Sequence, residues 1–383
     1  MKRICFVTTV SLTIKSFLLD FAHYLTEKDD FDVTFICNTD LYLNSICSNR
    51  IHYIPVEMKR GVGLDGFKVI KQLERIFKRE QFDIIQYSTP NAALYSSIAA
   101  KRAGCCNRLY CQWGIRYMGF DGRIKRQIFK TIEKITCSFS SIIESESFSL
   151  YDFSINEGLY SAEKASVIWN GSACGVSLLK YDLNKRQEWR NIKRKELGIP
   201  NNAIVFGFAG RFTRDKGLNE CIEAFRTVNL NHSDVYLLLI GSFDNEGTIQ
   251  EGLKKWALSS ANVKLVDWTN KVEEYYGAMD VFVSLSYREG FGLVVIEAAA
   301  MELPGIVTDC PGQRDTIVEN EDGWLVPVKN VDRVVSTMEY CINHLDEVHQ
   351  YGKNARKHVV EKYEQRELFR QLTEHRNSIL LSM

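Results

Sequence analysis

The sequence predicts an α/β protein with two doubly wound domains, each built on a parallel sheet. Two observations predict this class. Short apolar segments of strand character alternate with amphipathic segments of helical period along most of the chain, and a polar stretch interrupts this alternation near its middle. A chain of 383 residues is also long enough for two domains of roughly 150 to 200 residues, each with its own core.

The first half of the chain opens with a strand, a helix and a second strand. Apolar residues recur at helical spacing within the helix, and the flanking segments RICFVTT and DVTFICN have strand composition. A later helix carries a stripe of four isoleucines with the 3.6-residue period. The expected strands are 3–9, 32–38, 51–56, 83–88, 108–113 and 165–170, and the expected helices are 17–25, 67–78, 92–103 and 122–139.

The second half repeats the pattern after the polar segment SLLKYDLNKRQEWRNIKRKELGIPNN. This segment marks a domain boundary with one short charged helix. The expected strands are 203–210, 235–241, 263–267, 281–286, 305–309 and 323–328, and the expected helices are 218–227, 248–259, 272–278, 293–301 and two more up to residue 362. The predicted organisation is an N-terminal domain at 1–175, a linker at 176–200, a C-terminal domain at 201–362 and a last helix at 363–383, for which a return to the N-terminal domain is one option.

Composition restricts the class of protein. The formal net charge is zero, so global electrostatics give no reason to expect a nucleic-acid partner. Eleven cysteines without a C-x-x-C pair are typical of reduced thiols in a cytosolic protein, and no apolar run approaches the roughly 20 residues needed to cross a bilayer. A cytoplasmic protein, at most peripheral to a membrane, is therefore expected.

The segment SYREGFGLVVIEAAA carries two carboxylates in an apolar run. Gly290 and Gly292 fall in a strand-to-helix turn, where the free N–H groups of Leu293 and Val294 favour an anion such as a phosphate. Glu297 lies further into the helix among apolar neighbours, so its carboxylate requires hydrogen-bond donors. The vicinal hydroxyls of a ribose would satisfy it, and so would a buried arginine or a backbone N–H.

The segment FGFAGRFTRDKGLNECIEAF places two cations beside a strand end. Gly210 and Arg211 follow a buried strand, and Lys216 stands where the next helix begins. If this strand neighbours the one before Glu289, Arg211 and Lys216 converge on the same point. Two fixed cations there would hold a diphosphate and stabilise its charge as it leaves. Considered one at a time, each cation is better explained as a solvated surface charge.

Together, GRFTRDKG and SYREGFGLVVIEAAAMELPGIVTD resemble the phosphate-binding and E-x₇-E signatures of retaining glycosyltransferases of family 4. That family has the GT-B fold, in which two Rossmann-like doubly wound domains face each other across a cleft. The resemblance covers nearly the whole chain and is strongest over residues 205–327. It implies an enzyme of the bacterial surface-polysaccharide type that moves a hexose or N-acetylhexosamine from a nucleotide sugar, expected to be a UDP-sugar, to a glycan or a polyprenyl-diphosphate-linked acceptor.

The resemblance also implies residue roles. The implied catalytic residues are Arg211 and Lys216, which bind the diphosphate, and Glu289, which helps to hold the donor sugar. The implied donor-binding residues are Gly210, Trp268, Gly290, Phe291, Gly292, Leu293, Val294 and Glu297, with Trp268 bordering the base and Glu297 on the ribose. No DxD-like acidic pair stands at a strand end, so neither a metal nor a cofactor beyond the sugar donor is expected.

The acceptor side departs from the family pattern. Many relatives carry a histidine before a glycine at the strand end that is LYCQWG here, and this chain has Trp113 followed by Gly114. Because retention in the family is assigned to a front-face displacement without an enzyme nucleophile, the missing histidine does not by itself imply an inactive protein. Trp113 is expected to stack on a sugar face on the acceptor side.

A basic segment adds a possible membrane contact. Residues 101–134 contain nine lysines and arginines and two acidic residues. The part that begins with Arg116 and ends with Lys134 has two interpretations: contact with an anionic membrane that presents a lipid-linked acceptor, or an ordinary solvated helix face. We favour peripheral contact at the inner face of the cytoplasmic membrane.

Two other functional classes remain open from the sequence. A dinucleotide-dependent oxidoreductase is disfavoured because TTVSLTIKS, and not G-x-G-x-x-G, follows the first strand. A non-catalytic sugar-nucleotide-binding relative is disfavoured by Arg211, Lys216, Glu289 and Glu297, whereas the altered acceptor side keeps it open. Turnover of a sugar nucleotide would distinguish such a relative from an enzyme.

Overall fold

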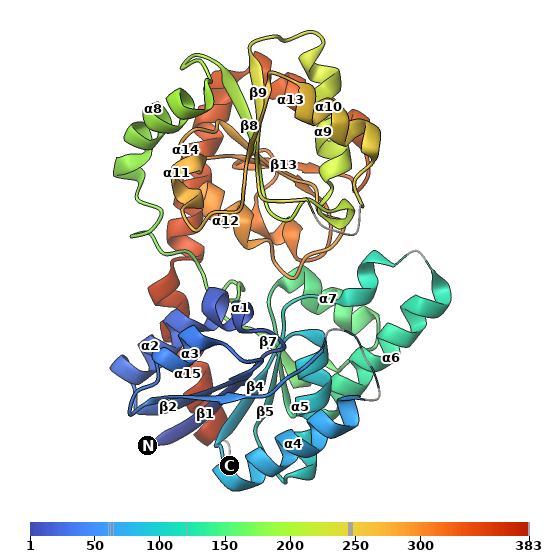
Figure 1. Cartoon of the computed structure of the whole chain (residues 1–383), viewed down its shortest axis with the longest axis vertical. Coiled ribbons are helices and arrows are strands. Elements are labelled where there is room, and N and C mark those ends of the chain that lie inside the picture. The colour runs from blue at the N-terminus through green and yellow to red at the C-terminus, as the bar shows by residue number, and fades with distance from the viewer. Residues whose placement is uncertain (60, 62, 64, 121, 244–247, 382–383) are drawn as a thin grey trace. The chain divides into compact units, whose positions relative to one another are not determined.

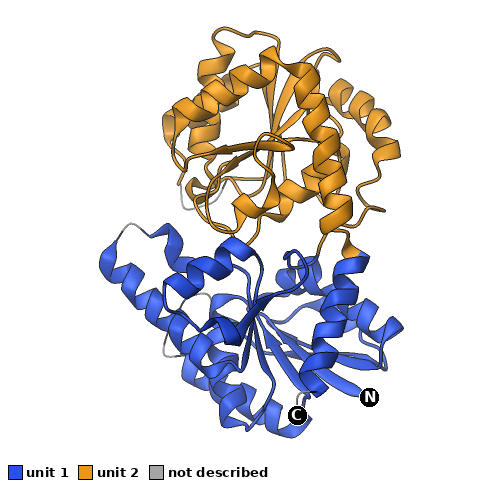
Figure 2. Cartoon of the chain, turned by 180° about the vertical axis from the view of Figure 1, so that it is seen from behind, with its two compact units in different colours: residues 1–174, 366–383 blue, residues 175–365 orange. Residues whose placement is uncertain are grey.

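The computed structural model describes residues 1–59, 61, 63, 65–120, 122–243 and 248–381 (Figure 1). The chain divides into two compact units, coloured separately in Figure 2. Unit 1 comprises Met1–Cys174 and Arg366–Met383, and unit 2 comprises Gly175–Gln365. Each unit has its own parallel sheet with helices on both faces, which confirms the predicted α/β fold class.

The described residues of unit 1 form a seven-stranded sheet in the order β3-β2-β1-β4-β5-β6-β7. Every neighbouring pair is parallel. All residues of β2 are buried, as expected for a strand covered on both faces. The strands are β1 (Lys2–Val7), β2 (Phe31–Cys37), β3 (Ile51–Pro55), β4 (Ile84–Tyr87), β5 (Arg108–Gln112), β6 (Ile142–Ser145) and β7 (Ala165–Val167).

Two apolar clusters cover the faces of this sheet. Helices α4 (Asp65–Glu80), α5 (Pro90–Arg102), α6 (Arg123–Phe139) and α7 (Phe148–Asn156) contribute to one of them. The π-helical turn η1 (Ile14–Leu18), α2 (Leu19–Lys28), α3 (Leu41–Ser45) and α15 (Gln365–Leu381) contribute to the other. The short helix α1 (Ser11–Thr13) and the 3₁₀ turns η2 (Arg116–Gly119) and η3 (Ala162–Lys164) complete the unit.

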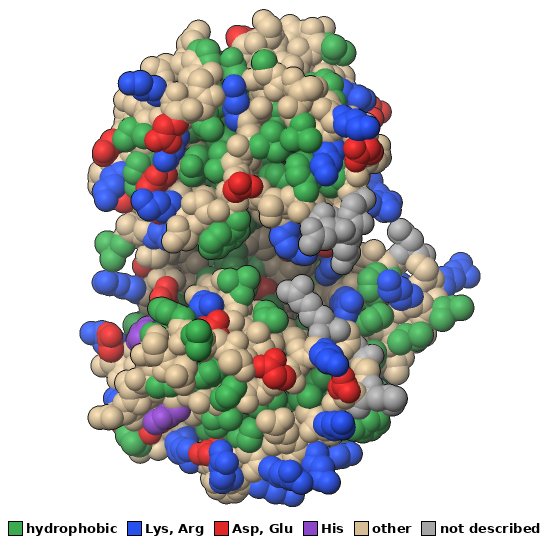
Figure 3. Space-filling model, viewed as in Figure 1, with side chains coloured by type: hydrophobic (Ala, Val, Ile, Leu, Met, Phe, Trp, Pro, Cys, Tyr) green, Lys and Arg blue, Asp and Glu red, His purple; other side chains and the backbone are tan. Residues whose placement is uncertain are grey.

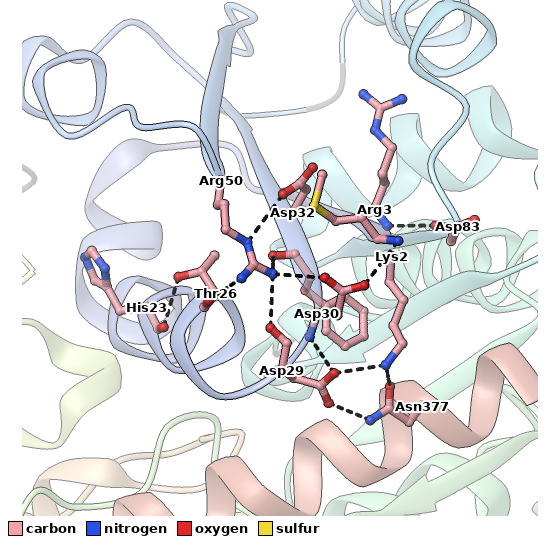
Figure 4. Close-up of polar contacts among 12 residues, drawn as sticks. Lys2, Arg3, His23, Thr26, Asp29, Asp30, Asp32, Arg50, Asp83 and Asn377 are labelled. Carbon is pink, nitrogen blue, oxygen red and sulfur yellow. Dashed lines mark hydrogen bonds and ion pairs between the residues drawn. The ribbon is translucent and has the colours of Figure 1, made fainter.

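Helix α15 is held to unit 1 by polar contacts as well as by its apolar face. Arg376 is almost fully buried and pairs with Glu144 of β6, and its Nη2 also donates to Gln86 Oε1 of β4 (2.9 Å). Near the start of β1, Asn377 accepts a hydrogen bond from Lys2 Nζ (2.8 Å) and donates one to Asp29 Oδ2 (2.7 Å), as Figure 4 shows. The last helix of the chain is therefore an integral part of unit 1.

The described residues of unit 2 form a six-stranded parallel sheet in the order β10-β9-β8-β11-β12-β13. All six residues of β8 are buried, which explains its uninterrupted apolar sequence IVFGFA. The strands are β8 (Ile204–Ala209), β9 (Val235–Ile240), β10 (Val263–Val266), β11 (Val281–Ser284), β12 (Gly305–Thr308) and β13 (Gly323–Val326).

Helices cover both faces of the second sheet. Helices α9 (Leu218–Asn229), α10 (Glu251–Ser259) and α13 (Val331–Asn343) pack on one face, and α11 (Val272–Tyr276) and α12 (Leu293–Ala299) pack on the other. Helix α14 (Leu345–Lys362) contributes to both clusters. Helix α8 (Arg186–Leu197), which lies in the segment expected as a linker, joins unit 2 through the fully buried Arg194, whose Nη2 pairs with Asp280 Oδ2 (2.8 Å). The 3₁₀ turns are η4 (Leu183–Lys185), η5 (Arg214–Lys216) and η6 (Gln313–Thr316).

The structure differs from the expected elements in more than one region of unit 1. Helix α3, strand β6 and helix α7 occupy residues for which no element was predicted. The isoleucine stripe that gives α6 its helical period is largely exposed at its start, where Ile124 and Ile128 are 81% and 54% exposed. The buried side of α6 includes Glu133, whose carboxylate accepts hydrogen bonds from Tyr110 and Gln112 (both 2.8 Å). This helix therefore faces the sheet partly through polar contacts and presents isoleucines at the surface.

Candidate functional site

The two motifs predicted to converge in unit 2 do meet, because β8 and β11 are neighbouring strands. Their loops leave the same edge of the sheet, and the Tyr287 N–H donates to the Asp215 carbonyl (2.9 Å). Gly217 permits this approach. A Cβ atom there would lie 2.0 Å from the Leu285 carbonyl oxygen, and the residue adopts φ +71°, so any side chain would collide and strain the backbone.

A cluster of charges lies at this junction. Lys216 Nζ donates to Glu289 Oε1 (2.5 Å), and the Ser286 hydroxyl donates to the same oxygen (2.8 Å). Arg288 pairs with Asp215 (3.2 Å). Burial acts to raise the pKa of Asp215, but the Thr213 hydrogen bond and the Arg288 charge outweigh it and hold this pKa below its usual value. Two of the three predicted catalytic residues, Lys216 and Glu289, are thus in direct contact.

A cavity of about 260 Å³ opens beside this cluster, at the carboxyl edge of the sheet of unit 2. Five predicted residues line it: Gly210, Arg211, Trp268, Val294 and Glu297. Arg211 is exposed and Trp268 is 73% exposed, so both are accessible to a ligand. The remaining lining residues are Ala209, Ile240, Gly241, Ser242, Thr269, Val272 and Tyr276. The cavity combines one cation, one carboxylate and several apolar surfaces.

Glu297 lies on α12 at the wall of this cavity, with its side chain partly buried. Burial raises the pKa of Glu297 above its usual value, while the Tyr181 hydroxyl and the Lys180 charge act in the opposite direction. A carboxylate in this position is stabilised by additional hydroxyl donors, as expected for a group that binds a diol.

The turn that leads to α12 contains the other predicted donor residues. Gly292 adopts φ +101° at the position before the helix, and the backbone of Gly290 lies against Gly312, where a Cβ atom would be 2.5 Å from the Gly290 carbonyl oxygen. Phe291 is buried and packs edge-on against Tyr363 at 5.1 Å. Its side chain anchors the turn, so its contact with a ligand would come through the backbone. Leu293 is partly buried and begins the helix.

The predicted acceptor residues lie in unit 1, just after β5. Trp113 is partly buried and packs against Phe17 with ring centres 5.5 Å apart. Gly114 follows it with φ +114°. Part of the Trp113 ring is therefore occupied by an internal contact, which leaves less of it available to stack on a sugar than the sequence suggested.

Sequence reasoning missed several residues of the cavity. Ser242, Thr269 and Tyr276 line it, and Tyr181 lies behind it. Tyr276 ends a short amphipathic helix, a position that usually indicates core packing, so its sequence context gives no functional signal. Among the described residues, no group of three or more histidine, cysteine, aspartate or glutamate side chains is arranged to hold a metal ion.

The chain matches two family models, one over each half. Residues 3–147 match the model described as glycosyl transferase 4-like, and residues 190–358 match the model described as glycosyl transferases group 1. The capsular polysaccharide biosynthesis glycosyltransferase CapM of Staphylococcus aureus is 30% identical over 354 residues, which cover 92% of this chain and 91% of CapM. The chain belongs to the GT-B glycosyltransferases.

A second relative and a solved structure are also similar to this glycosyltransferase. The UDP-Gal:alpha-D-GlcNAc-diphosphoundecaprenol alpha-1,3-galactosyltransferase of Escherichia coli is 25% identical over 328 residues, which cover 82% of this chain and 81% of the relative. The crystal structure of Anabaena HepE in complex with UDP and glucose superposes with a TM-score of 0.79 at 17% identity, covering 99% of this chain and all of HepE. This similarity confirms the GT-B fold, and family membership rules out the oxidoreductase alternative.

In the described part of the chain, no helix combines the length and the hydropathy needed to cross a bilayer.

Proposed function

We propose that this glycosyltransferase moves a hexose or N-acetylhexosamine from a UDP-sugar, with retention of configuration, to a glycan or polyprenyl-diphosphate-linked acceptor in surface-polysaccharide biosynthesis. The relationship to CapM supports the pathway, and the name of the Escherichia coli relative supports a lipid-linked acceptor. The crystal structure of HepE, which is a complex with UDP and glucose, supports the class of donor.

One observation carries the proposal. Arg211 and Glu297 line a single cavity, and the Lys216–Glu289 pair lies in the loops that adjoin it. Cations bind a diphosphate and carboxylates accept hydrogen bonds from sugar hydroxyls, so the arrangement can bind both the diphosphate and the sugars of a nucleotide sugar.

Each residue has a role in the proposed reaction. The bond between the anomeric carbon and the diphosphate breaks, and the diphosphate leaves with the electron pair. Arg211 and Lys216 stabilise the negative charge that develops on it. The acceptor hydroxyl attacks the same face of the sugar, and its proton passes to the departing diphosphate. Glu289 and the backbone of residues 290–294 hold the donor sugar, and Glu297 holds the ribose. Because two side chains supply the positive charge, the proposal requires no metal.

Binding and turnover test this proposal separately. Calorimetric titration of the wild type and Glu297→Gln with UDP, GDP, ADP and NAD should show selective binding of UDP that weakens in the variant. Incubation with UDP-sugars and a polyprenyl-diphosphate-linked glycan as acceptor should then release UDP, and Arg211→Ala or Lys216→Ala should abolish this release. Near-normal turnover by either variant would contradict the proposed roles, and tight binding without turnover of any sugar nucleotide would indicate a non-catalytic relative.

We further propose that the enzyme works at the cytoplasmic face of the membrane and contacts anionic lipid through α6. Ile124, Ile128 and Ile135 are 81%, 54% and 37% exposed and lie on one stripe of the helix. The exposed Arg123 and Lys125 flank the start of this stripe. Figure 3 shows basic and hydrophobic side chains side by side over α6. An amphipathic helix with this combination fits the interface of a negatively charged bilayer.

Flotation with vesicles tests the membrane contact. The protein should float with phosphatidylglycerol-containing vesicles at low salt and much less with pure phosphatidylcholine vesicles. Ile128→Asn should reduce flotation, whereas Leu230→Asn, at an 82% exposed site in unit 2, should not. Equal flotation of both variants would contradict a role for α6.

A further inference from the structure

One buried hydroxyl at the cavity of unit 2, Tyr276 Oη, has no hydrogen-bond partner within the described part of the chain. Tyr276 is 0% exposed. Tyr181, which is 2% exposed, interacts through its hydroxyl with Glu297. Buried hydroxyls are nearly always hydrogen-bonded, so the unpartnered hydroxyl of Tyr276 requires an explanation.

The two tyrosines are held in place by aromatic packing. Their rings stack with centres 6.2 Å apart and planes 25° apart. The Tyr276 ring also packs edge-on against Phe282, at 5.6 Å and 83°. Because the Tyr276 ring is held on two sides, its hydroxyl cannot turn far to find another partner. The packing therefore fixes the direction in which this hydroxyl points.

Both hydroxyls interact electrostatically with Glu297. The pKa of Tyr276 is raised first by burial and next by the negative charge of Glu297, and the same two causes raise the pKa of Tyr181. Tyr276 and Glu297 both line the cavity. Lys180 Nζ lies 3.8 Å from Glu273 Oε2, which is an ion pair at long range. Glu297 and Tyr276 thus line the cavity, and Tyr181 and Glu273 both act on the Glu297 carboxylate.

We propose that Tyr276 is a specificity-determining residue of the nucleotide site, where its hydroxyl donates a hydrogen bond to an oxygen of the ribose diol held by Glu297. This inference rests on the proposed nucleotide-sugar site. The diol hydroxyls donate to the Glu297 carboxylate, which accepts several hydrogen bonds, and their oxygens remain available as acceptors. The Tyr276 hydroxyl then gains the partner that it lacks in the free protein, and Tyr181 orients the carboxylate from behind.

The arrangement predicts selection for the ribose. A nucleotide without the diol leaves Glu297 and Tyr276 unpaired, and a site built to hydrogen-bond a hydroxyl rejects an analogue that lacks it. The selection should hold for any base, because the predicted contact is with the sugar. Tyr276 therefore governs the ratio of affinities for ribonucleotide and dideoxyribonucleotide, and not the preference among bases.

Calorimetry with UDP and 2′,3′-dideoxy-UDP tests the inference, on the wild type, Tyr276→Phe and the control Tyr275→Phe. The neighbouring Tyr275 is partly buried, and its ring lies 4.8 Å from Lys193 Nζ. Tyr276→Phe should weaken UDP binding by about tenfold and leave dideoxy-UDP binding unchanged, so that the affinity ratio falls by about tenfold. Tyr275→Phe should leave both affinities at their wild-type values.

Thermal unfolding of the ligand-free protein provides a second readout. Tyr276→Phe removes a hydroxyl without a partner and keeps the aromatic packing, so its melting temperature should equal or exceed that of the wild type. A lower melting temperature would assign the hydroxyl a structural role and overturn the inference. Normal UDP binding with an unchanged affinity ratio in Tyr276→Phe would overturn the inference alone, whereas failure of the wild type to bind UDP, GDP or ADP would overturn the proposed nucleotide site as well.

Discussion

Replacing Lys216 with methionine separates its proposed role in binding from its role in the folded protein. In the free protein its ammonium group donates to Glu289 Oε1 at 2.5 Å, and the two side chains are 27% and 17% exposed. Methionine keeps most of the aliphatic length and removes the charge. Glu289 retains the hydrogen bond from Ser286.

The two effects differ in expected magnitude. A partly exposed ion pair contributes up to about 1 kcal/mol, so the free energy of unfolding should fall by no more than that. A hydrogen bond from a cation to a phosphate contributes about 1.5–3 kcal/mol, which corresponds to a loss of roughly 10- to 100-fold in affinity for UDP. Uridine carries no phosphate, so its affinity should not change.

Calorimetric titration with UDP and uridine measures this difference. Lys255→Met is a suitable control because Lys255 is 74% exposed and lies 3.7 Å from Glu251 in a surface pair. The control should bind both ligands like the wild type. Equal weakening of UDP and uridine in Lys216→Met would mean that the substitution distorts the cavity, and unchanged UDP binding would refute the contact with the diphosphate.

Two further predictions concern buried charges. Burial raises the pKa of Glu297 above its usual value of 4.5, so its ionised form destabilises the folded protein at neutral pH. Glu297→Gln should therefore raise the melting temperature of the ligand-free protein at pH 7, and this gain should vanish as the pH falls below 4.5. A variant that melts below the wild type at pH 7 would be inconsistent with this cause. Arg376→Met should lower the free energy of unfolding, measured in urea, by about 3–5 kcal/mol because it removes the buried arginine that pairs with Glu144. Arg370→Met, on the exposed side of the same helix, should lower this free energy by less than about 1 kcal/mol. Burial acts to raise the pKa of Glu144, but Arg376 and His375 lower it to about 2. The stabilisation by the Arg376–Glu144 pair should therefore be fully present above pH 4.5 and be lost as the pH approaches 2. Equal losses of unfolding free energy in Arg376→Met and Arg370→Met would refute the role of the buried pair.

Most of the fold follows from local sequence patterns. The buried strands of unit 2 are continuous apolar runs, and their boundaries in the structure lie within a few residues of those expected. Strand β6 was missed because it consists of four residues, IIES, of which two are polar. Its pairing with β5 and β7 defines it as a strand, and such long-range contacts are not visible in a local pattern.

Part of the candidate site, like most of the fold, could be predicted from local sequence patterns. The convergence of Lys216 with Glu289 required only that β8 and β11 be neighbours, which is the arrangement in the sheet. Tyr276 was not predicted because an aromatic residue at the end of an amphipathic helix usually serves the core, and only its unpartnered hydroxyl distinguishes it. The exposure of the isoleucines of α6 could not be predicted either, because periodicity reveals an apolar face but not what that face contacts.

The placement of α15 has a consequence for biosynthesis. Unit 2 is continuous in the chain, whereas unit 1 is completed only by the residues after 365. At a translation rate of about 5–20 residues per second, roughly 10–40 s separate the two parts of unit 1. During this interval Glu144 lacks Arg376, and the apolar face that receives Leu368 and Phe369 is uncovered. The nascent N-terminal part thus exposes apolar surface until α15 is made, although it is synthesised first, and unit 2 can complete its fold before it.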